Sequence, residues 1–251
     1  REYFVGIYTL GTGRRLGRGS GFQRRQHSVG WLRSRNDVCC GCYYLGRRVT
    51  QTRTVLVTGG NRGIGLATAK RFADQGHRVA ITARDPGDVD SRILAIPCDQ
   101  TDADAVDRAY QAIESELGNV EVLVANAGIT KDQLLLRMSD DDFSTVIDTN
   151  LKGSYRVAQR ATRTMLRARW GRLIFVSSVV GLLGSAGQAN YAASKAGLVG
   201  LARSMARELG SRNITANIVS PGPVATEMLD ALSEDQRSAI TEQVPLKRVA
   251  E

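Results

Sequence analysis

Short apolar runs alternate with longer amphipathic stretches from residue 54 onward. The short runs are rich in Val, Ile and Leu, which is typical of buried strands. In the longer stretches apolar residues recur every three or four positions, so that one side of a helix would be apolar. The predicted strands lie at 54–58, 78–82, 92–98, 120–128, 172–178 and 214–220, and the predicted helices at 65–76, 102–118, about 140–152, 154–168 and 190–210.

The order of these elements determines the expected fold class. Strands that are buried on both faces, each followed by an amphipathic helix, form a parallel sheet with helices on both sides. Residues 54–251 contain no internal repeat and no linker-like segment. The sequence therefore predicts one α/β domain, a doubly wound, Rossmann-like parallel sheet.

Residues 1–53 lack this alternation and have an unusual charge. They hold eleven arginines, no lysine, and only Glu2 and Asp37 as acids, which accounts for the whole formal charge of +9. Residues 54–251 are balanced, so the main body lacks the basic surface of a nucleic-acid-binding protein. We expect the extension to be disordered or not native to the protein. A transit peptide and an RNA-binding arm are the alternatives.

Cysteine usage indicates a reducing compartment. Cys39, Cys40 and Cys42 lie in the extension, and Cys98 is alone in the main body. No Cys and His residues have the spacing of a zinc site, so no metal is expected. A cytoplasmic protein with reduced thiols is the simplest interpretation. The uncharged run 173–194 has the length of a membrane span, but Ser, Gly, Gln and Asn interrupt it, which favours a strand and a loop.

A glycine-rich segment, TGGNRGIG at 58–65, joins the first predicted strand to the first predicted helix. Gly59 and Gly63 permit tight turns and a close approach of a pyrophosphate to the backbone. The N–H groups at the start of the following helix would then face the phosphates. Glycines often simply end a strand, but this strand–loop–helix context indicates dinucleotide binding.

The end of the second strand favours one nucleotide over the other. An acidic side chain there binds the ribose 2′-OH of NAD, whereas an arginine accommodates the 2′-phosphate of NADP. The acidic position holds Ala83, and Arg84 follows it. Arg62 in the loop can reach the same phosphate, and guanidinium groups suit phosphate geometry. NADP(H) is the predicted cofactor, although Asp85 leaves a ribose contact open.

Tyr191 and Lys195 stand four residues apart in NYAASK, at 190–195. On a helix such residues share a face, with their Cβ atoms about 5–6 Å apart. Taken alone, the pair is compatible with a half-buried tyrosine beside a solvated lysine. A hydrolase that uses Ser178 is disfavoured, because the only histidines are His27 and His77 and no Ser-His-Asp set is credible.

Together these motifs resemble the short-chain dehydrogenase/reductase family over residues 54–251. The resemblance is carried by TGGNRGIG, NAG at 126–128, Asn150 in DTNLKG, Ser178 and YAASK. Within the family, the segment from Gly187 to Met228 is similar to 3-oxoacyl-[acyl-carrier-protein] reductases of the FabG type. VLVTGGNRGIGLA and YRVAQRATRTM are similar to their mycobacterial, MabA-like branch.

The resemblance implies a catalytic set for ketone reduction. Tyr191 would donate the proton, and a neighbouring Lys195 ammonium would lower its pKa from the usual value of about 10. Lys195 would also bind the nicotinamide ribose. Ser178 would hold the substrate carbonyl, and Asn150 would anchor a water that relays protons to Lys195. The structural alternative is that Asn150 is a helix irregularity and Ser178 bonds its own backbone.

The resemblance also implies further binding residues. Asp99 would contact adenine, Gly128 the nucleotide and Val224 the nicotinamide amide. Arg169 and Arg212 would receive the acidic carrier, unless they are simply two solvated arginines. The full set expected to bind NADPH is Gly59, Asn61, Arg62, Gly63, Ile64, Gly65, Arg84, Asp99, Gln100, Asn126, Gly128, Tyr191, Lys195, Val224 and Thr226.

The expected function is NADPH-dependent reduction of 3-oxoacyl-[acyl-carrier-protein] to the 3-hydroxyacyl form, in fatty-acid or mycolic-acid elongation. Reduction of an acyl-CoA, steroid or sugar is one alternative, and nucleotide or RNA binding without turnover is another. Helices at about 142–168 and 190–210 are expected to make a homo-oligomer. The family continues beyond Glu251 with a helix and a seventh strand, so we expect a C-terminally incomplete domain with an exposed strand edge.

Overall fold

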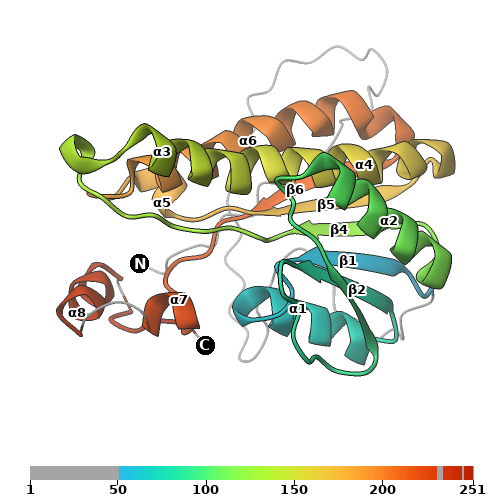
Figure 1. The fold of residues 1–251 in the computed structure, drawn as a ribbon, viewed down its shortest axis with the longest axis horizontal. Helices are drawn as coiled ribbons and strands as arrows, with labels where there is room; N and C mark the ends of the chain where they lie inside the picture. Colours follow the sequence, from blue (N-terminus) through green and yellow to red (C-terminus); the bar gives the residue numbers. More distant parts are fainter. Residues whose placement is uncertain (1–50, 231–233, 245, 251) are drawn as a thin grey trace, which may run out of the picture.

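A computed structural model describes residues 51–230, 234–244 and 246–250 of the chain. Its centre is a six-stranded sheet in the order β3-β2-β1-β4-β5-β6 (Figure 1), in which every pair of neighbours is parallel. The chain winds outward in both directions from β1 and β4, as in doubly wound folds. The strands are β1 (Thr54–Thr58), β2 (Arg78–Ala83), β3 (Ile93–Pro97), β4 (Val122–Ala125), β5 (Gly171–Val176) and β6 (Ile214–Val219).

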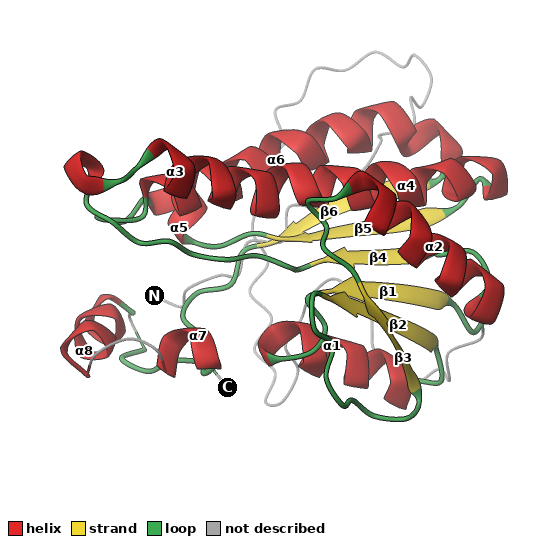
Figure 2. Ribbon diagram, viewed as in Figure 1, coloured by secondary structure: helices red, strands yellow, loops and turns green. Residues whose placement is uncertain are grey.

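Helices cover both faces of the sheet (Figure 2). Helices α2, α4 and α6 lie on one face and α1 on the other, where it packs against β1, β2 and β3. The described helices are α1 (Gly63–Asp74), α2 (Ala103–Leu117), α3 (Asp140–Ile147), α4 (Gly153–Ala168), α5 (Val180–Leu183), α6 (Ala189–Leu209), α7 (Glu227–Asp230) and α8 (Glu234–Gln243), with 3-10 turns at Leu135–Arg137 and Gly210–Arg212 and a π-helical turn at Asp148–Lys152.

Two apolar clusters hold these layers together. Alternate side chains of each strand point to opposite faces, so the inner strands are buried on both sides. Leu56 and Phe175 pack under α2, α4 and α6, whereas Val55 and Val57 face α1. All five residues of β1 are buried, as the uninterrupted apolar run predicted. The predicted fold class, a Rossmann-like α/β sheet, is confirmed.

The predicted boundaries are wrong where polar side chains replace backbone partners. Strand β4 ends at Ala125 rather than 128, because the N–H groups of Asn126 and Ala127 both donate to Thr58 Oγ1, at 3.1 and 3.0 Å. The two helices predicted at 140–152 and 154–168 form one continuous helical stretch with the π-helical turn at its centre. Helices α5, α7 and α8 were not predicted at all.

The uncharged run 173–194 forms most of β5, a loop, α5 and the start of α6. The prediction of a strand followed by a loop is therefore right in outline, although it missed α5. In the described part of the chain, none of the helices has both the length and the apolar character needed to cross a membrane.

Arg53 shows where the packed body begins. Its guanidinium lies 3.9 Å over the ring of Trp170, and its backbone N–H donates to His77 Nδ1 at 3.1 Å. The last residue of the predicted extension thus belongs to the folded body. Predictions about residues 1–50 lie outside the described residues. Strand β6 lies at one edge of the sheet and pairs only with β5 among the described strands, and its Thr215 and Asn217 are half-buried.

Candidate active site

The predicted cofactor and catalytic residues gather at one edge of the sheet. Because all six strands are parallel, the loops that follow them meet at their carboxyl ends, where ligands bind in open α/β sheets. The glycine-rich segment follows β1, Arg84 follows β2, and Asp99 follows β3. The NAG segment follows β4 and Ser178 follows β5. The linear sequence thus places these residues far apart, and the sheet brings them together.

The loop after β1 has the backbone of a phosphate site. Gly59 has a φ of +61°, and a Cβ there would lie 2.8 Å from Ala127 Cα, so no larger residue fits. Gly63, Ile64 and Gly65 form the first turn of α1, which begins without a side-chain cap. The N–H groups of this turn therefore face outward without side-chain acceptors, at the positive end of the helix dipole. Such a terminus suits a pyrophosphate.

Asn126 fixes the shape of this loop from the neighbouring strand. Its Nδ2 donates to Thr58 O at 3.0 Å and to Gly59 O at 3.1 Å. A Cβ on Gly65 would lie 2.1 Å from Gly59 O, so the first turn of α1 packs directly on the loop. Asn126 therefore holds the loop in shape. Its direct contact with a cofactor stays a prediction.

The residues expected to select the nucleotide lie on the surface. Arg84 is exposed immediately after β2. Asn61 Nδ2 donates to the carbonyl of Asp85 at 2.9 Å, which joins the two loops. Arg62 pairs with Glu227 at 3.1 Å, but both side chains are more than 60% exposed, so the pair stabilises the fold by less than about 1 kcal/mol. Arg62 is thus weakly held and can exchange its partner for a phosphate.

The segment after β6 folds back over the glycine-rich loop. A Cβ on Gly63 would contact Thr226 Cγ2 at 3.4 Å. Val224 is held in a bridge with Ala250, and Ala225 N donates to Ala250 O at 2.8 Å. This arrangement places Thr226 beside the glycine-rich loop. Cofactor contacts of Val224 and Thr226 stay predictions.

Asp99 and Gln100 follow β3 on the adenine side of the predicted site. The Asp99 Oδ1 accepts hydrogen bonds from Thr101 N and Oγ1, both at 2.8 Å, which fixes the turn. The Gln100 side chain is buried and points its amide nitrogen at backbone carbonyls rather than outward. Direct cofactor contacts of Asp99 and Gln100 stay predictions.

Tyr191 and Lys195 lie on the first turns of α6, one above the other. The Lys195 Nζ is 5.6 Å from the centre of the Tyr191 ring and donates to Val176 O at 2.8 Å. Lys195 is only 4% exposed, so the alternative of a solvated lysine is wrong. Its aliphatic stem and ammonium are both enclosed at the end of β5.

Burial dominates the acid–base properties of this pair. It lowers the pKa of Lys195 from its ordinary value to about 8. Burial also raises the pKa of Tyr191, and the hydrogen-bonding hydroxyl of Ser178 opposes this increase. The net shift of the Tyr191 pKa in this structure is therefore upward, with desolvation of the phenol as its largest cause. A lowering of this pKa by Lys195 stays a prediction.

Ser177 and Ser178, which follow β5, make different contacts. Ser178 accepts a hydrogen bond from Val180 N at 3.2 Å and also interacts with Tyr191. Ser177 is buried, and its Oγ donates to Lys195 O at 2.8 Å. Ser178 thus combines a local backbone bond with a place beside the catalytic candidate. Ser177 fastens α6 to the end of β5.

Asn150 lies at the centre of the π-helical turn and is completely buried. Its Oδ1 accepts from Ile129 N at 2.8 Å, and its Nδ2 donates to Ile129 O and to Ser194 Oγ, both at 3.0 Å. Ser194 Oγ in turn donates to Tyr191 O at 2.7 Å. Asn150 is therefore linked through Ser194 to the tyrosine, and a Cβ on Gly128 would lie 3.1 Å from its Oδ1.

Three residues of this network, Ser177, Asn190 and Ser194, were not predicted from the sequence. Asn190 is fully buried; its Oδ1 accepts from Tyr191 N at 2.7 Å and its Nδ2 donates to Lys131 O at 2.9 Å. The sequence offered one signal for them: they are polar residues close in sequence to the predicted site residues, and polar groups that become buried need hydrogen-bond partners. The identity of the partners is not visible in the sequence.

The structure does not bring Arg169 and Arg212 to the catalytic residues. Helix α6 has 21 residues, so it is about 30 Å long. Tyr191 lies near its first turn, whereas Arg212 follows its end. Arg169 precedes β5 and therefore also lies at the amino ends of the strands. Both side chains are exposed, and their role in carrier docking stays a prediction.

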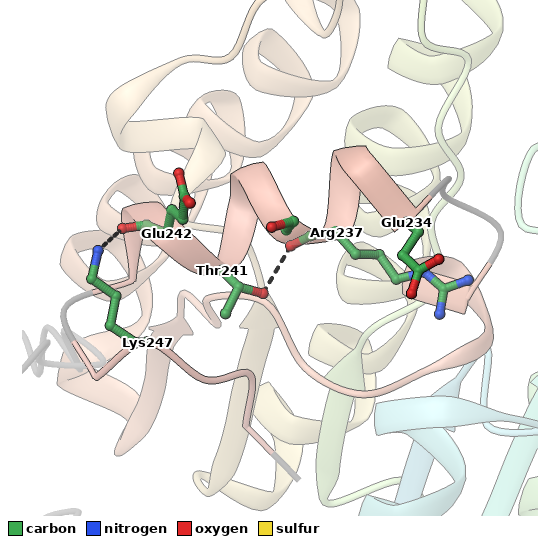
Figure 3. A pocket seen from close by; sticks show the side chains of 6 residues that line it. Glu234, Arg237, Thr241, Glu242 and Lys247 are labelled. Carbon is green, nitrogen blue, oxygen red and sulfur yellow. Dashed lines mark hydrogen bonds between the residues drawn. The ribbon is translucent and has the colours of Figure 1, made fainter.

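A pocket of about 540 Å³ lies elsewhere, along α8 (Figure 3). None of the predicted site residues lines this pocket, and the side chains that do line it are charged or carry a hydroxyl group. Thr241 Oγ1 donates to Arg237 O at 2.8 Å, and the Lys247 ammonium donates to Glu242 O. Both of these bonds join residues that lie four or five positions apart in the sequence. The lining residues are Glu234, Arg237, Ser238, Thr241, Glu242 and Lys247.

Comparison with known proteins agrees with this geometry. The chain is 54% identical over 198 residues to the 3-oxoacyl-[acyl-carrier-protein] reductase MabA of Mycobacterium bovis, which covers 79% of this chain and 80% of the relative. It is 52% identical over 204 residues to MabA of Mycobacterium avium, covering 81% and 80%. It is 44% identical over 208 residues to FabG, the 3-oxoacyl-[acyl-carrier-protein] reductase of Staphylococcus aureus, covering 78% and 85%. A family model described as short chain dehydrogenase matches residues 53–237. The resemblance found in the motifs is thereby confirmed, and the chain belongs to the short-chain dehydrogenase family.

Proposed function

We propose that this chain reduces 3-oxoacyl thioesters on acyl carrier protein to 3-hydroxyacyl thioesters with NADPH. The observation that carries the proposal is the joining of Tyr191, Lys195, Ser178 and Asn150 around one end of β5 and α6. The names of the relatives support the substrate class.

The reaction requires a hydride at the carbonyl carbon and a proton at its oxygen. NADPH, when bound, would supply the hydride, and the carbonyl π electrons would move onto oxygen. Tyr191 Oη then gives that oxygen its proton. Burial keeps the tyrosine protonated beforehand, since it raises the Tyr191 pKa. Ser178 Oγ donates a hydrogen bond to the same oxygen and so stabilises its growing negative charge.

Four features of the chain fit a nicotinamide dinucleotide. Gly59 leaves space that a Cβ would fill, and α1 starts without a side-chain cap. Ala83 and exposed Arg84 take the place of an acidic ribose ligand, which favours the 2′-phosphate of NADPH over NADH. Arg62 adds a second cation at the loop.

The proposed setting is fatty-acid or mycolic-acid elongation in the cytoplasm, with the chain acting as a homo-oligomer. Exposed Phe143, Tyr155 and Leu166 on α3 and α4 support self-association. Arg169 and Arg212 are the proposed carrier contacts. Because they lie far from Tyr191 in the same chain, a carrier held by them would have to deliver its thioester to the active site of a second copy.

The test measures NADPH oxidation by the purified chain with acetoacetyl-carrier protein and with acetoacetyl-CoA. We expect turnover with both and a higher kcat/KM for the carrier thioester. Equal use of both would favour an acyl-CoA reductase, and no turnover with either would refute the proposal.

Tyr191→Phe is the matched variant, because it removes the phenolic hydroxyl and little else. We expect its rate to fall to less than about a tenth of the original, a change of about 1.4 kcal/mol or more in the barrier. NADPH binding, measured by fluorescence titration, should change less than about twofold. A variant that keeps its rate would show that Tyr191 is not the acid.

A further inference from the structure

Gln100 makes contacts that its place in the nucleotide site does not require. It follows β3, is 7% exposed, and its Nε2 donates to Thr149 O at 2.7 Å and to Ala127 O at 3.2 Å. Both acceptors are carbonyls, so the orientation of the amide is determined by its partners. One side chain thus joins the ends of β3 and β4 to the helical stretch that carries Asn150.

The π-helical turn explains why Thr149 needs this donor. In an α-helix, Gly153 N–H would donate to Thr149 O, four residues earlier. Here it donates to Asp148 O, five residues earlier. The Thr149 carbonyl thereby loses its usual helical donor, and Gln100 Nε2 supplies another. A partly buried carbonyl left without a donor would cost free energy, so the amide of Gln100 stabilises the turn in its wide form.

The same turn positions the catalytic candidates. Asn150 follows Thr149 in the turn, and its side chain makes hydrogen bonds with both the N–H and the carbonyl of Ile129. Through Ser194 it also reaches Tyr191 O. A π-helical turn is rare and is frequently found at functional sites. Closing it into an α-helix would rotate Asn150 away from these partners.

We infer that Gln100 is a positioning residue that keeps the π-helical turn open and thereby holds Asn150 in register with Tyr191 and Lys195. It joins the adenine side of the nucleotide site to the catalytic end without touching the reacting atoms. This inference about rate rests on the proposed reductase function. The inference about the turn itself does not.

The absence of a side chain at Gly153 independently supports the contact between Gln100 and the turn. A Cβ on Gly153 would lie 2.7 Å from Gln100 Cγ and 2.9 Å from its Nε2. The glycine therefore leaves room for the Gln100 side chain beneath the first turn of α4. Gly153→Ala should push the amide away from Thr149 and reproduce the effect of removing it.

The experiment compares Gln100→Met with the full-length wild type. Methionine keeps the length of the side chain and removes both donors. Gln111→Met, on the exposed face of α2, is the matched control. Hydrogen exchange is measured for the amide of Ile129 and for residues 148–154, together with kcat, the Kd of NADPH and Tm.

We expect Gln100→Met to speed exchange of the Ile129 amide and of the turn by at least about tenfold, since the turn would open more often. We expect kcat to fall about ten- to a hundredfold, as for a displacement of about 1 Å, with the Kd of NADPH changed less than about threefold. Gly153→Ala should behave similarly, and Gln100→Ala combined with Gly153→Ala should be no worse than Gln100→Ala, because the two act on one contact.

Three results would overturn the inference: unchanged exchange, faster exchange with unchanged kcat, or a loss of NADPH affinity that accounts for the whole loss of activity. A lower Tm alone, with exchange in the turn and kcat preserved, would mean that Gln100 only stabilises the fold. If the wild type reduces no 3-oxoacyl thioester, the proposed function fails, and the exchange measurement still decides whether Gln100 holds the turn.

Discussion

Replacing Lys195 by methionine should make the protein more stable and inactive. The lysine is 4% exposed, and burial lowers its pKa from 10.5 to about 8. At about 1.4 kcal/mol for each pKa unit, keeping its ammonium buried costs the folded state about 3 kcal/mol at pH 7. Methionine removes this cost and loses the hydrogen bond to Val176 O, worth about 1 kcal/mol. The net gain is about 2 kcal/mol.

The sign of the effect depends on pH in a defined way. Because the folded pKa lies below the unfolded value, the unfolded chain binds more protons between pH 8 and 10.5, and wild-type stability rises with pH across this window. The advantage of Lys195→Met is therefore complete below pH 8 and shrinks above it. Above pH 10.5 only the lost hydrogen bond remains, and the variant should be about 1 kcal/mol less stable than wild type.

Thermal and urea unfolding at pH 7 and pH 9.5 measure the difference. A gain of about 2 kcal/mol corresponds to about 4–8 °C in Tm for a domain of this size. Lys70→Met, at an exposed position of α1, is the control and should show no comparable gain at either pH. The reasoning is refuted if Lys195→Met is no more stable than wild type at pH 7, or if its advantage does not decrease at pH 9.5.

Two further predictions concern charge at the surface and at the amino edge of the sheet. Arg84→Asp should raise the KM for NADPH at least about tenfold and that for NADH less than about threefold, because the carboxylate would face the 2′-phosphate; equal losses in steady-state assays would contradict this. Burial, and then the charge of Arg53, lower the pKa of His77, whose Nδ1 accepts from Arg53 N. The contribution of His77 to the free energy of unfolding is present above pH 6.5 and is lost as pH falls toward the lower folded pKa. Urea unfolding of His77→Asn should therefore show a free energy of unfolding that changes less with pH between pH 7 and pH 5 than that of the wild type. An identical pH dependence in the two proteins would exclude His77 as the titrating group.

Much of the fold was readable from local patterns. Runs such as TVLVT at 54–58 must be buried on both faces, and the helix after TGGNRGIG starts where the glycines allow a turn. The boundaries were less predictable, because they depend on polar side chains from other elements. Strand β4 stops at Ala125 because Thr58 takes the next two N–H groups, and Thr58 is remote in sequence.

The candidate site was predictable only in part for the same reason. Tyr191 and Lys195 share a helix face by their spacing alone, and the family motifs assigned Ser178 and Asn150. The burial of the pair was not predictable, since spacing says nothing about burial, and it is burial that raises the Tyr191 pKa and lowers that of Lys195. Ser177, Asn190 and Ser194 were missed, as each has a partner that is remote in sequence: Lys195 O for Ser177, Lys131 O for Asn190 and Asn150 Nδ2 for Ser194.

The sequence by itself determined the alternation of strands and helices and the glycine loop, because these depend on local periodicity and residue type, and its resemblance to a family supplied the catalytic candidates. The tertiary structure decided how they are held. The π-helical turn at Asp148–Lys152 receives a hydrogen bond from Gln100, which lies 49 residues before Thr149 and donates to its carbonyl. Hydrogen bonds between remote segments produce no periodic pattern of residues in the sequence. They nevertheless determine the positions of Asn150, Tyr191 and Lys195 relative to one another.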